Sequence, residues 1–173
     1  MIITPPQKED YPEFYHTYVK KVESTDLLDG LRKEMSTTLT LLGSLDDAIV
    51  NYRYEKDKWN IKEVMIHMID AERVFSYRAL RFGRHDTTPL AGFDQNEFGA
   101  RVLNISRKMD SILDEYQSVR KSTLSLYENF KEEDLNVTGM ASDAPVTVRA
   151  IGYITLGHNI HHRLGIESNY LSK

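Results

Sequence analysis

The sequence predicts an all-α fold, an antiparallel four-helix bundle, for its 173 residues. Four long segments carry apolar residues at intervals of three or four, which is the periodicity of an amphipathic helix. Strand signals are few, and residues that favour helix starts precede several of these segments. Hydrophobic residues make up 40% and charged residues 28%, a composition typical of one globular domain spanning residues 1–173. Long amphipathic segments with short connectors favour a bundle.

The first half of the chain contains two of the four long helices. Residues 1–23 are expected to form an N-terminal extension that packs on the bundle, with a short helix over 11–22. That short helix should turn three aromatic side chains inward: Phe14, Tyr15 and Tyr18. The sequence Ser-Thr-Asp at 24–26 is a helix start signal, and the apolar stripe after it predicts a helix from 27 to about 48.

The second long helix has the clearest start signal. Asn60 suits the N-cap and Glu63 follows three residues later, as in a capping box. We expect this helix over 61–82, with Gly83 suited to its C-terminal cap. A short helical piece is expected over 94–103. Asp94 and Asn96 in this stretch have two interpretations, as residues that cap the short helix or as residues of a loop that folds over a site.

The second half predicts two more long helices, over 106–130 and 148–171, the latter with Thr147 as N-cap. A short helical turn is expected over 131–134. Residues 135–146 are expected to be irregular, because Gly139 and Pro145 interrupt them. A loop of this length in a compact domain is often functional.

The last predicted helix carries candidate metal ligands. Side chains four positions apart on a helix point about 40° from each other. His158 and His162 therefore project side by side, which is how two imidazoles on one helix share a metal ion. His161 is an alternative to His162, because it lies three residues from His158, but its direction is less close.

A third ligand is available in His67. At about 100° per residue, His67 lies on the border between the apolar face and the charged strip of its helix. Asp70, one turn further on, is the candidate catalytic residue, able to orient an imidazole or to accept a substrate proton. Three neutral imidazoles with an open position suit Zn²⁺, Ni²⁺ or Mn²⁺. The competing interpretation is that all three histidines are core residues with no ligand.

Other side chains permit a structural and a functional interpretation. Trp59 precedes the second long helix, where it could pack on the first turn or line a substrate pocket. Four arginines give the same helix a basic stripe, either solvated or an anchor for a carboxylate on a thiol or substrate. They are Arg73, Arg78, Arg81 and Arg84.

Composition excludes several classes of function. The chain has no cysteine, so disulfides, zinc–thiolate sites and a cysteine nucleophile are absent, and any thiol must arrive as a small molecule. The net charge is −4 and no basic run stands out, so nucleic-acid binding has little support. No apolar run is long enough to cross a membrane, and the start of the chain lacks a secretion signal, so we expect a cytoplasmic protein.

Several segments resemble the DinB-like superfamily of bacterial four-helix-bundle proteins. They are KWNIKEV at 58–64, HMIDAER at 67–73, GFDQN at 92–96, TVR at 147–149 and GHNIHH at 157–162. The resemblance runs from about residue 24 to the end. It implies an up-up-down-down bundle with a long crossover, often a homodimer, and a metal held by His67, His158 and His162. Founding members are induced by DNA damage, which suggests a stress response.

The resemblance implies a metal-dependent enzyme, because characterised relatives include transferases and an isomerase that use bacillithiol or mycothiol. The first hypothesis is therefore a transferase that joins a low-molecular-weight thiol to a small electrophile. The second is a metal-dependent hydrolase, in which Asp70 or another carboxylate acts as base. The third is a non-enzymatic, stress-related bundle with a structural metal. All three leave the metal and the substrate unidentified.

Overall fold

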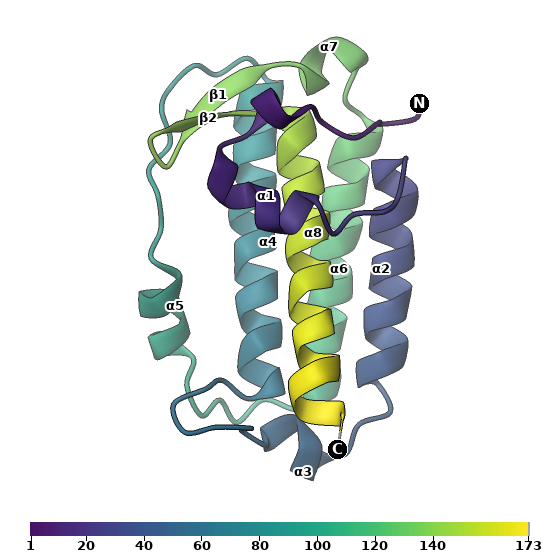
Figure 1. Ribbon diagram of the computed structural model, residues 1–173, viewed down its shortest axis with the longest axis vertical. Coiled ribbons are helices and arrows are strands. Elements are labelled where there is room, and N and C mark those ends of the chain that lie inside the picture. The colour runs from purple at the N-terminus through teal and green to yellow at the C-terminus, as the bar shows by residue number, and fades with distance from the viewer. Residues whose placement is uncertain (173) are drawn as a thin grey trace.

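The computed structural model describes residues 1–172 and is a four-helix bundle, as the sequence predicts (Figure 1). The bundle helices are α2 (Leu27–Leu42), α4 (Ile61–Gly83), α6 (Met109–Glu128) and α8 (Val148–Ile166). Helix α8 contacts both α2 and α4, and α6 contacts the same two helices on the other side. The buried residues between them form a hydrophobic core along the length of the bundle. Within residues 1–172, no helix is both long and apolar enough to span a membrane.

The order of helix directions differs from the up-up-down-down order that the resemblance implied. Helices α4 and α6 are parallel, since Glu72 pairs with Arg120 and Ser76 pairs with Thr123 one turn further along both helices. In Figure 1, α2 descends, α4 and α6 both ascend, and α8 descends. The order is thus down, up, up, down. The expected long crossover is present and joins the two parallel helices.

The helix starts follow the capping signals of the sequence. The Asn60 side chain accepts a hydrogen bond from the Glu63 N–H at 3.0 Å, and the Glu63 carboxylate accepts one from the Asn60 N–H at 3.0 Å. The Thr147 hydroxyl accepts a hydrogen bond from the Ala150 N–H at the start of α8. Both N-caps are confirmed, because these oxygens satisfy N–H groups that have no partner within the first turn.

The ends of three helices differ from the expectation. Helix α2 ends at Leu42, and a separate helix α3 (Asp47–Asn51) follows with Asp46 as its N-cap. Helix α6 begins at Met109, three residues later than expected. Helix α8 ends at Ile166 and continues as a π-helical turn, η3 (Glu167–Leu171). Gly83 ends α4, but no positive φ angle marks it as a left-handed cap.

The stretch 135–146 was expected to be irregular, and this expectation is wrong. After a short helix α7 (Glu132–Leu135), strands β1 (Thr138–Ala141) and β2 (Ala144–Thr147) form an antiparallel hairpin. Ser142 and Asp143 are its two loop residues, with φ angles of 53° and 61°. A two-residue hairpin loop of this kind usually carries Asn-Gly or Asp-Gly, so the Ser-Asp sequence gave no clear signal.

The N-terminal extension packs against α8. It contains two 3₁₀ turns, η1 (Lys8–Asp10) and η2 (Glu13–Tyr15), and the short helix α1 (His16–Val19). Gly157 permits the close approach, because a Cβ atom there would lie 2.3 Å from the Tyr18 carbonyl oxygen. The expectation that Phe14 faces inward is wrong, since this side chain is 57% exposed.

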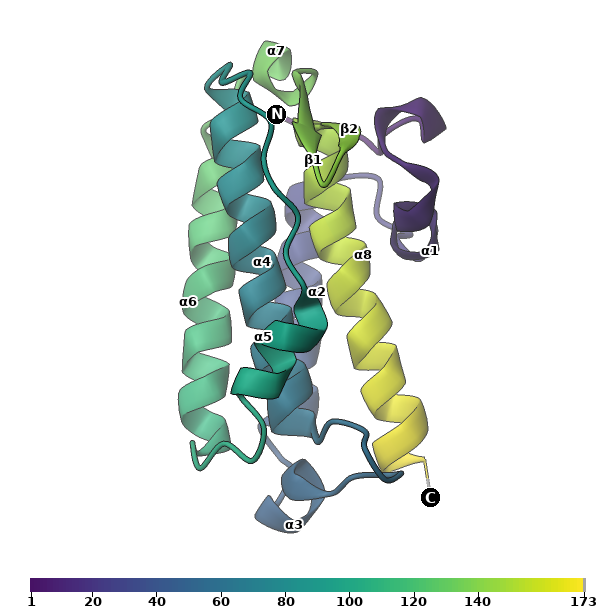
Figure 2. The same ribbon diagram turned by 90° about the vertical axis from the view of Figure 1, so that its left-hand side faces the viewer.

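The crossover between α4 and α6 contains the short helix α5 (Gln95–Arg101), which lies beside α4 (Figure 2). Gly99 makes this packing possible, because a Cβ atom there would lie 2.3 Å from the Trp59 indole. Asp94 is the N-cap of α5 and accepts hydrogen bonds from the N–H groups of Asn96 and Glu97. The capping interpretation of Asp94 is therefore confirmed.

Candidate metal centre

Three histidines converge in the interior, between α4 and α8. His67 lies on α4, and His158 and His162 lie one turn apart on α8. The Nε2 atom of His158 is 3.1 Å from the Nε2 atom of His67 and 3.1 Å from that of His162. One ligand atom from each residue lies within 4.8 Å of the other two, so this group, the histidine cluster, could hold a metal ion.

Burial keeps the histidine cluster uncharged. It lowers the pKa of His67 to about 4. Burial, and to a smaller extent the imidazoles of His67 and His161, lowers the pKa of His162 to about 3. Burial and then its histidine neighbours hold the pKa of His158 well below its ordinary value of 6.5. The three side chains are therefore neutral at pH 7, which is the form that binds metals.

The cluster cannot satisfy its own hydrogen-bonding groups. An imidazole nitrogen offers one N–H or one lone pair in the ring plane. The His158 Nε2 atom faces two other Nε2 atoms at 3.1 Å and cannot bond well to both. A metal ion would accept all three lone pairs. Tetrahedral zinc, with Zn–N bonds of about 2.0–2.1 Å, places neighbouring nitrogens about 3.3 Å apart. The two separations from His158, 3.1 Å each, are close to this value, and the ligand atoms of His67 and His162 lie within 4.8 Å of each other.

Aromatic side chains surround the cluster. The Trp59 indole lies 5.1 Å from the His67 ring between centroids. The Tyr18 ring lies 5.2 Å from His158 and 5.3 Å from His161. His161 thus packs against Tyr18, while His162 completes the cluster, which agrees with the preference drawn from their spacing. Phe75 closes the remaining side, with its ring 5.8 Å from that of His158.

Asp70 is not brought to the cluster. Its carboxylate lies 3.6 Å from Arg73, and Glu115 of α6 is close enough to affect its titration. Burial raises the pKa of Asp70, an effect that Arg73 partly opposes. Asp70 does not line either of the two cavities that adjoin the histidines. Its direction on α4 therefore gives the suggested catalytic role no geometric support.

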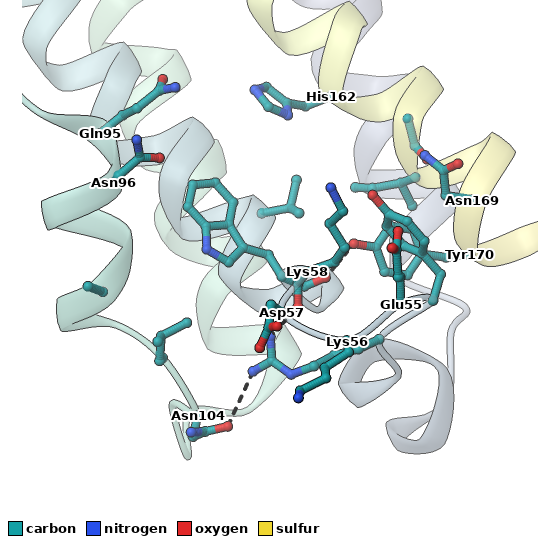
Figure 3. A pocket seen from close by; sticks show the side chains of 18 of the residues that line it. Glu55, Lys56, Asp57, Lys58, Gln95, Asn96, Asn104, His162, Asn169 and Tyr170 are labelled. Atoms are coloured by element: carbon teal, nitrogen blue, oxygen red, sulfur yellow. Dashed lines mark hydrogen bonds between the residues drawn. The ribbon is translucent and has the colours of Figure 1, made fainter.

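A broad open cleft of about 1240 Å³, the polar cavity, reaches the cluster at His162. Its walls are the connector 53–59, helix α5 and the C-terminal part of α8. Figure 3 shows Gln95 and Asn96 of α5 across the space from His162 of α8 and Asn169 of η3. Trp59 lines this cavity and also packs against the buried cluster that includes Val64 at the start of α4, so the structure agrees with both interpretations of that residue.

A second, smaller cavity of about 230 Å³, the aromatic cavity, reaches the cluster at His67 and His158. Five aromatic side chains line it: Phe14, Tyr15, Tyr18, Phe75 and Phe93. Gln95 lines both cavities, so they adjoin at α5. The histidine cluster therefore lies between a wide space lined by many polar residues and a small one lined mainly by aromatic side chains.

Sequence reasoning missed the contributions of the N-terminal extension and the crossover. Tyr18 carries no motif of its own, and Gln95 was noted only as part of the GFDQN segment, with no role at the histidines. The cluster of Phe14, Tyr15 and Tyr18 was a signal of burial, but the sequence did not indicate that these rings would lie next to histidines on α8. Residues 18 and 158 are far apart in the chain, and sequence patterns indicate contacts only between residues that are close together in it.

Comparison with known proteins identifies the family. Residues 30–166 match the DinB superfamily, which covers most of the chain and confirms the resemblance. The chain belongs to the DinB superfamily. This DinB superfamily member is similar in structure to YfiT from Bacillus subtilis, with a TM-score of 0.67 and 13% identity, over 91% of this chain and 86% of that one.

YfiT is described as a probable metal-dependent hydrolase with an unusual four-helix bundle topology. At 13% identity, the likeness concerns the fold. A search of curated proteins found no match to this chain.

Proposed function

We propose that this DinB superfamily member is a divalent-metal-dependent transferase that joins a low-molecular-weight thiol to a small electrophile. The observation that supports this proposal is the place of the histidine cluster between two cavities, a wide one lined by many polar residues and a small one lined mainly by aromatic side chains. A reaction between two molecules needs two binding spaces that meet at the reacting atoms. The polar cavity suits a hydrophilic thiol, and the aromatic cavity suits an apolar electrophile.

In this proposal His67, His158 and His162 hold Zn²⁺, Ni²⁺ or Mn²⁺. The bound ion supplies Lewis-acid chemistry, which lowers the pKa of a coordinated thiol or water. The neutral, buried imidazoles provide three nitrogen ligands and leave a position open for a substrate. The amides of Gln95, Asn96 and Asn169 offer donors and acceptors to the polar part of the thiol.

The surroundings of the cluster favour thiol transfer over hydrolysis. Hydrolysis commonly uses a carboxylate base within hydrogen-bond reach of the attacking water. No carboxylate is among the described residues that line the aromatic cavity, and Asp70 lines neither cavity. The carboxylates that line the polar cavity, Glu55 and Asp57, lie on its exposed connector. A thiol with a lowered pKa needs no such base.

The experiment begins with metal content, measured by mass spectrometry on protein purified without a histidine tag. We expect near-stoichiometric metal in the wild type and its loss in His158→Ala. The metal-loaded protein is then incubated with monochlorobimane and a panel of small thiols, cysteine among them. Conjugation should exceed the background and disappear with chelation. A metal-loaded protein that conjugates no thiol would contradict the transferase proposal.

Hydrolysis is the second candidate, because YfiT is described as a probable metal-dependent hydrolase. Turnover of ester or amide substrates by the metal-loaded protein, without any added thiol, would favour this candidate over transfer. His158→Ala serves as the matched control in both assays, since the two functions use the same three histidines.

A further inference from the structure

The four arginines of the α4 stripe have different surroundings. Arg73 is half exposed, pairs with Glu115 at 2.8 Å and lies 3.6 Å from Asp70. Arg81 pairs with Asp86 and contacts Tyr77. Arg84 lies over the Phe130 ring, with the guanidinium carbon 5.7 Å from the ring centroid. The charges of these three guanidinium groups are therefore stabilised by nearby side chains or by solvent.

Arg78 is the exception, because it is 3% exposed and its partners are uncharged. Its Nη2 donates to the Ala91 carbonyl at 3.0 Å and to the Ser142 hydroxyl at 2.9 Å, and its Nη1 reaches the Tyr15 hydroxyl at 3.5 Å. Within residues 1–172, no carboxylate lies within 4.0 Å of it. A buried charge normally has an acidic partner, because its transfer from water is costly.

Two of the hydrogen-bond partners of Arg78, Tyr15 and Ser142, line the aromatic cavity, and Arg78 itself lies behind them. Tyr15, Phe93 and Ser142 all line that space, and the Arg78 guanidinium carbon lies 6.0 Å from the Phe93 ring centroid. A dry cavity of about 150 Å³ holds a benzene molecule, so 230 Å³ leaves room for a ring and a few further atoms. A buried cation without a carboxylate partner thus lies directly behind the wall of a ring-sized space, in contact with two of the residues that form that wall.

We propose that the aromatic cavity binds an aryl carboxylate, with the ring among Tyr15, Phe75 and Phe93 and the carboxylate paired with Arg78. The identification of this aryl carboxylate as the electrophile of the reaction rests on the proposed function. The binding of an aryl carboxylate in the cavity does not. A guanidinium presents N–H groups in a fork that matches a carboxylate, so this pair would supply the missing anion.

The position of Arg78 along α4 orients such a ligand. Arg78 and His67 are eleven residues apart, which is roughly 16 Å along a helix axis at about 1.5 Å per residue. Long helical side chains usually lean toward the N-terminus of their helix, which on α4 is the direction of the cluster. A carboxylate at Arg78 therefore places the far side of the ring toward His67 and His158.

The test is a titration with 3-phenylpropionate, followed by NMR on the metal-free and the metal-loaded protein. The neutral amide of the same acid is the matched probe. We expect the acid to bind at least about tenfold more tightly than the amide in both forms, because hydrogen bonds between charged groups are the stronger ones. Equal affinities for the acid and the amide would overturn the proposal.

Two variants locate the carboxylate. Arg78→Met should remove the preference for the acid, while Arg81→Met, a matched change one turn along α4, should retain it. Ser142→Ala removes one partner of Arg78 without removing its charge and should keep the preference, even if Arg78→Met fails to fold. If Ser142→Ala, which keeps the charge of Arg78, also loses the preference for the acid, then Arg78 acts through its structural contacts and not by pairing with the carboxylate. That result would overturn the proposal.

The metal-free protein separates this inference from the proposed function. Acid binding that persists in a protein unable to take up metal would support the Arg78 site and contradict the metal-dependent function. A metal-loaded protein that conjugates thiols but shows no preference for the acid would support the proposed function and overturn the Arg78 site. Acid binding that requires metal and is unchanged in Arg78→Met would place the carboxylate at the histidine cluster and overturn the proposal.

Discussion

Two buried polar groups of helix α4 differ in how completely they are satisfied. One is the ion pair of Glu72 with Arg120 of α6, and both side chains have no exposed surface. The Arg120 Nε and Nη2 atoms donate to the two carboxylate oxygens at 2.8 and 2.9 Å, and Nη1 donates to the Leu31 carbonyl at 3.0 Å. The other is the histidine cluster, five residues earlier on the same helix.

The histidine cluster lacks this internal completeness. Its nitrogens face one another, and the Nδ1 atom of the buried His158 has no hydrogen-bond partner among the described residues. The ion pair needs nothing more, whereas the facing nitrogens of the cluster could be completed by a cation from outside. The difference separates a polar group that joins helices from one that could bind a ligand.

The largest effect should follow from breaking the ion pair. Arg120→Met leaves Glu72 buried and unpaired, and it should lower the free energy of unfolding by about 3–5 kcal/mol. Urea denaturation at pH 7.5 measures this loss. The double variant Glu72→Met/Arg120→Met should recover most of it, because no charge then remains buried. A single variant as stable as the wild type would mean that water reaches Glu72.

Metal binding should produce the next largest effect, and it should depend on the cluster alone. With free zinc at a hundred times its dissociation constant, the free energy of unfolding should rise by about 2.7 kcal/mol relative to chelated protein. His158→Ala should show no such rise. The ion-pair double variant should keep it, since its histidines are intact. A zinc response that survives in His158→Ala would place the ion elsewhere.

Acid should weaken the metal-free protein through the same histidines. The folded-state pKa is about 4 for His67 and about 3 for His162, below the ordinary value of 6.5. Below pH 6.5 the unfolded chain therefore binds protons that the folded chain does not. The contribution is complete above pH 6.5 and is lost as the pH falls toward 4, by about 1 kcal/mol for each histidine at pH 5.5.

Urea denaturation of the chelated protein at pH 7.5 and pH 5.5 checks this loss. His67→Gln should be less sensitive to the change, because glutamine does not titrate. Equal stability of the chelated wild type at the two pH values would show that the cluster is solvated and readily protonated.

The smallest effect is expected for Asp70→Asn. The Asp70 carboxylate faces Arg73 and Glu115 and lines neither cavity. The substitution should change the free energy of unfolding by less than about 0.5 kcal/mol, because ion pairs at the surface contribute little. Metal content and thiol conjugation should both be unchanged. A large loss of conjugation with normal metal content would restore Asp70 as a catalytic candidate.

Local structure and part of the candidate site follow from contacts between residues that are neighbours in the chain. Hydrophobic periodicity and the caps at Asn60 and Thr147 located the bundle helices, because capping is a contact between neighbours in the chain. The side-by-side placement of His158 and His162 follows in the same way from the helix repeat. These predictions involve separations of four residues or fewer.

Tertiary structure decided the contacts between distant segments. The approach of His67 to His158, the pairing of Glu72 with Arg120 and the burial of Arg78 depend on which helices are adjacent and in which direction they run. Periodicity contains no information on direction, so the parallel arrangement of α4 and α6 was not foreseen. The hairpin of β1 and β2 belongs here too, because four-residue strands are stabilised by pairing and packing more than by propensity.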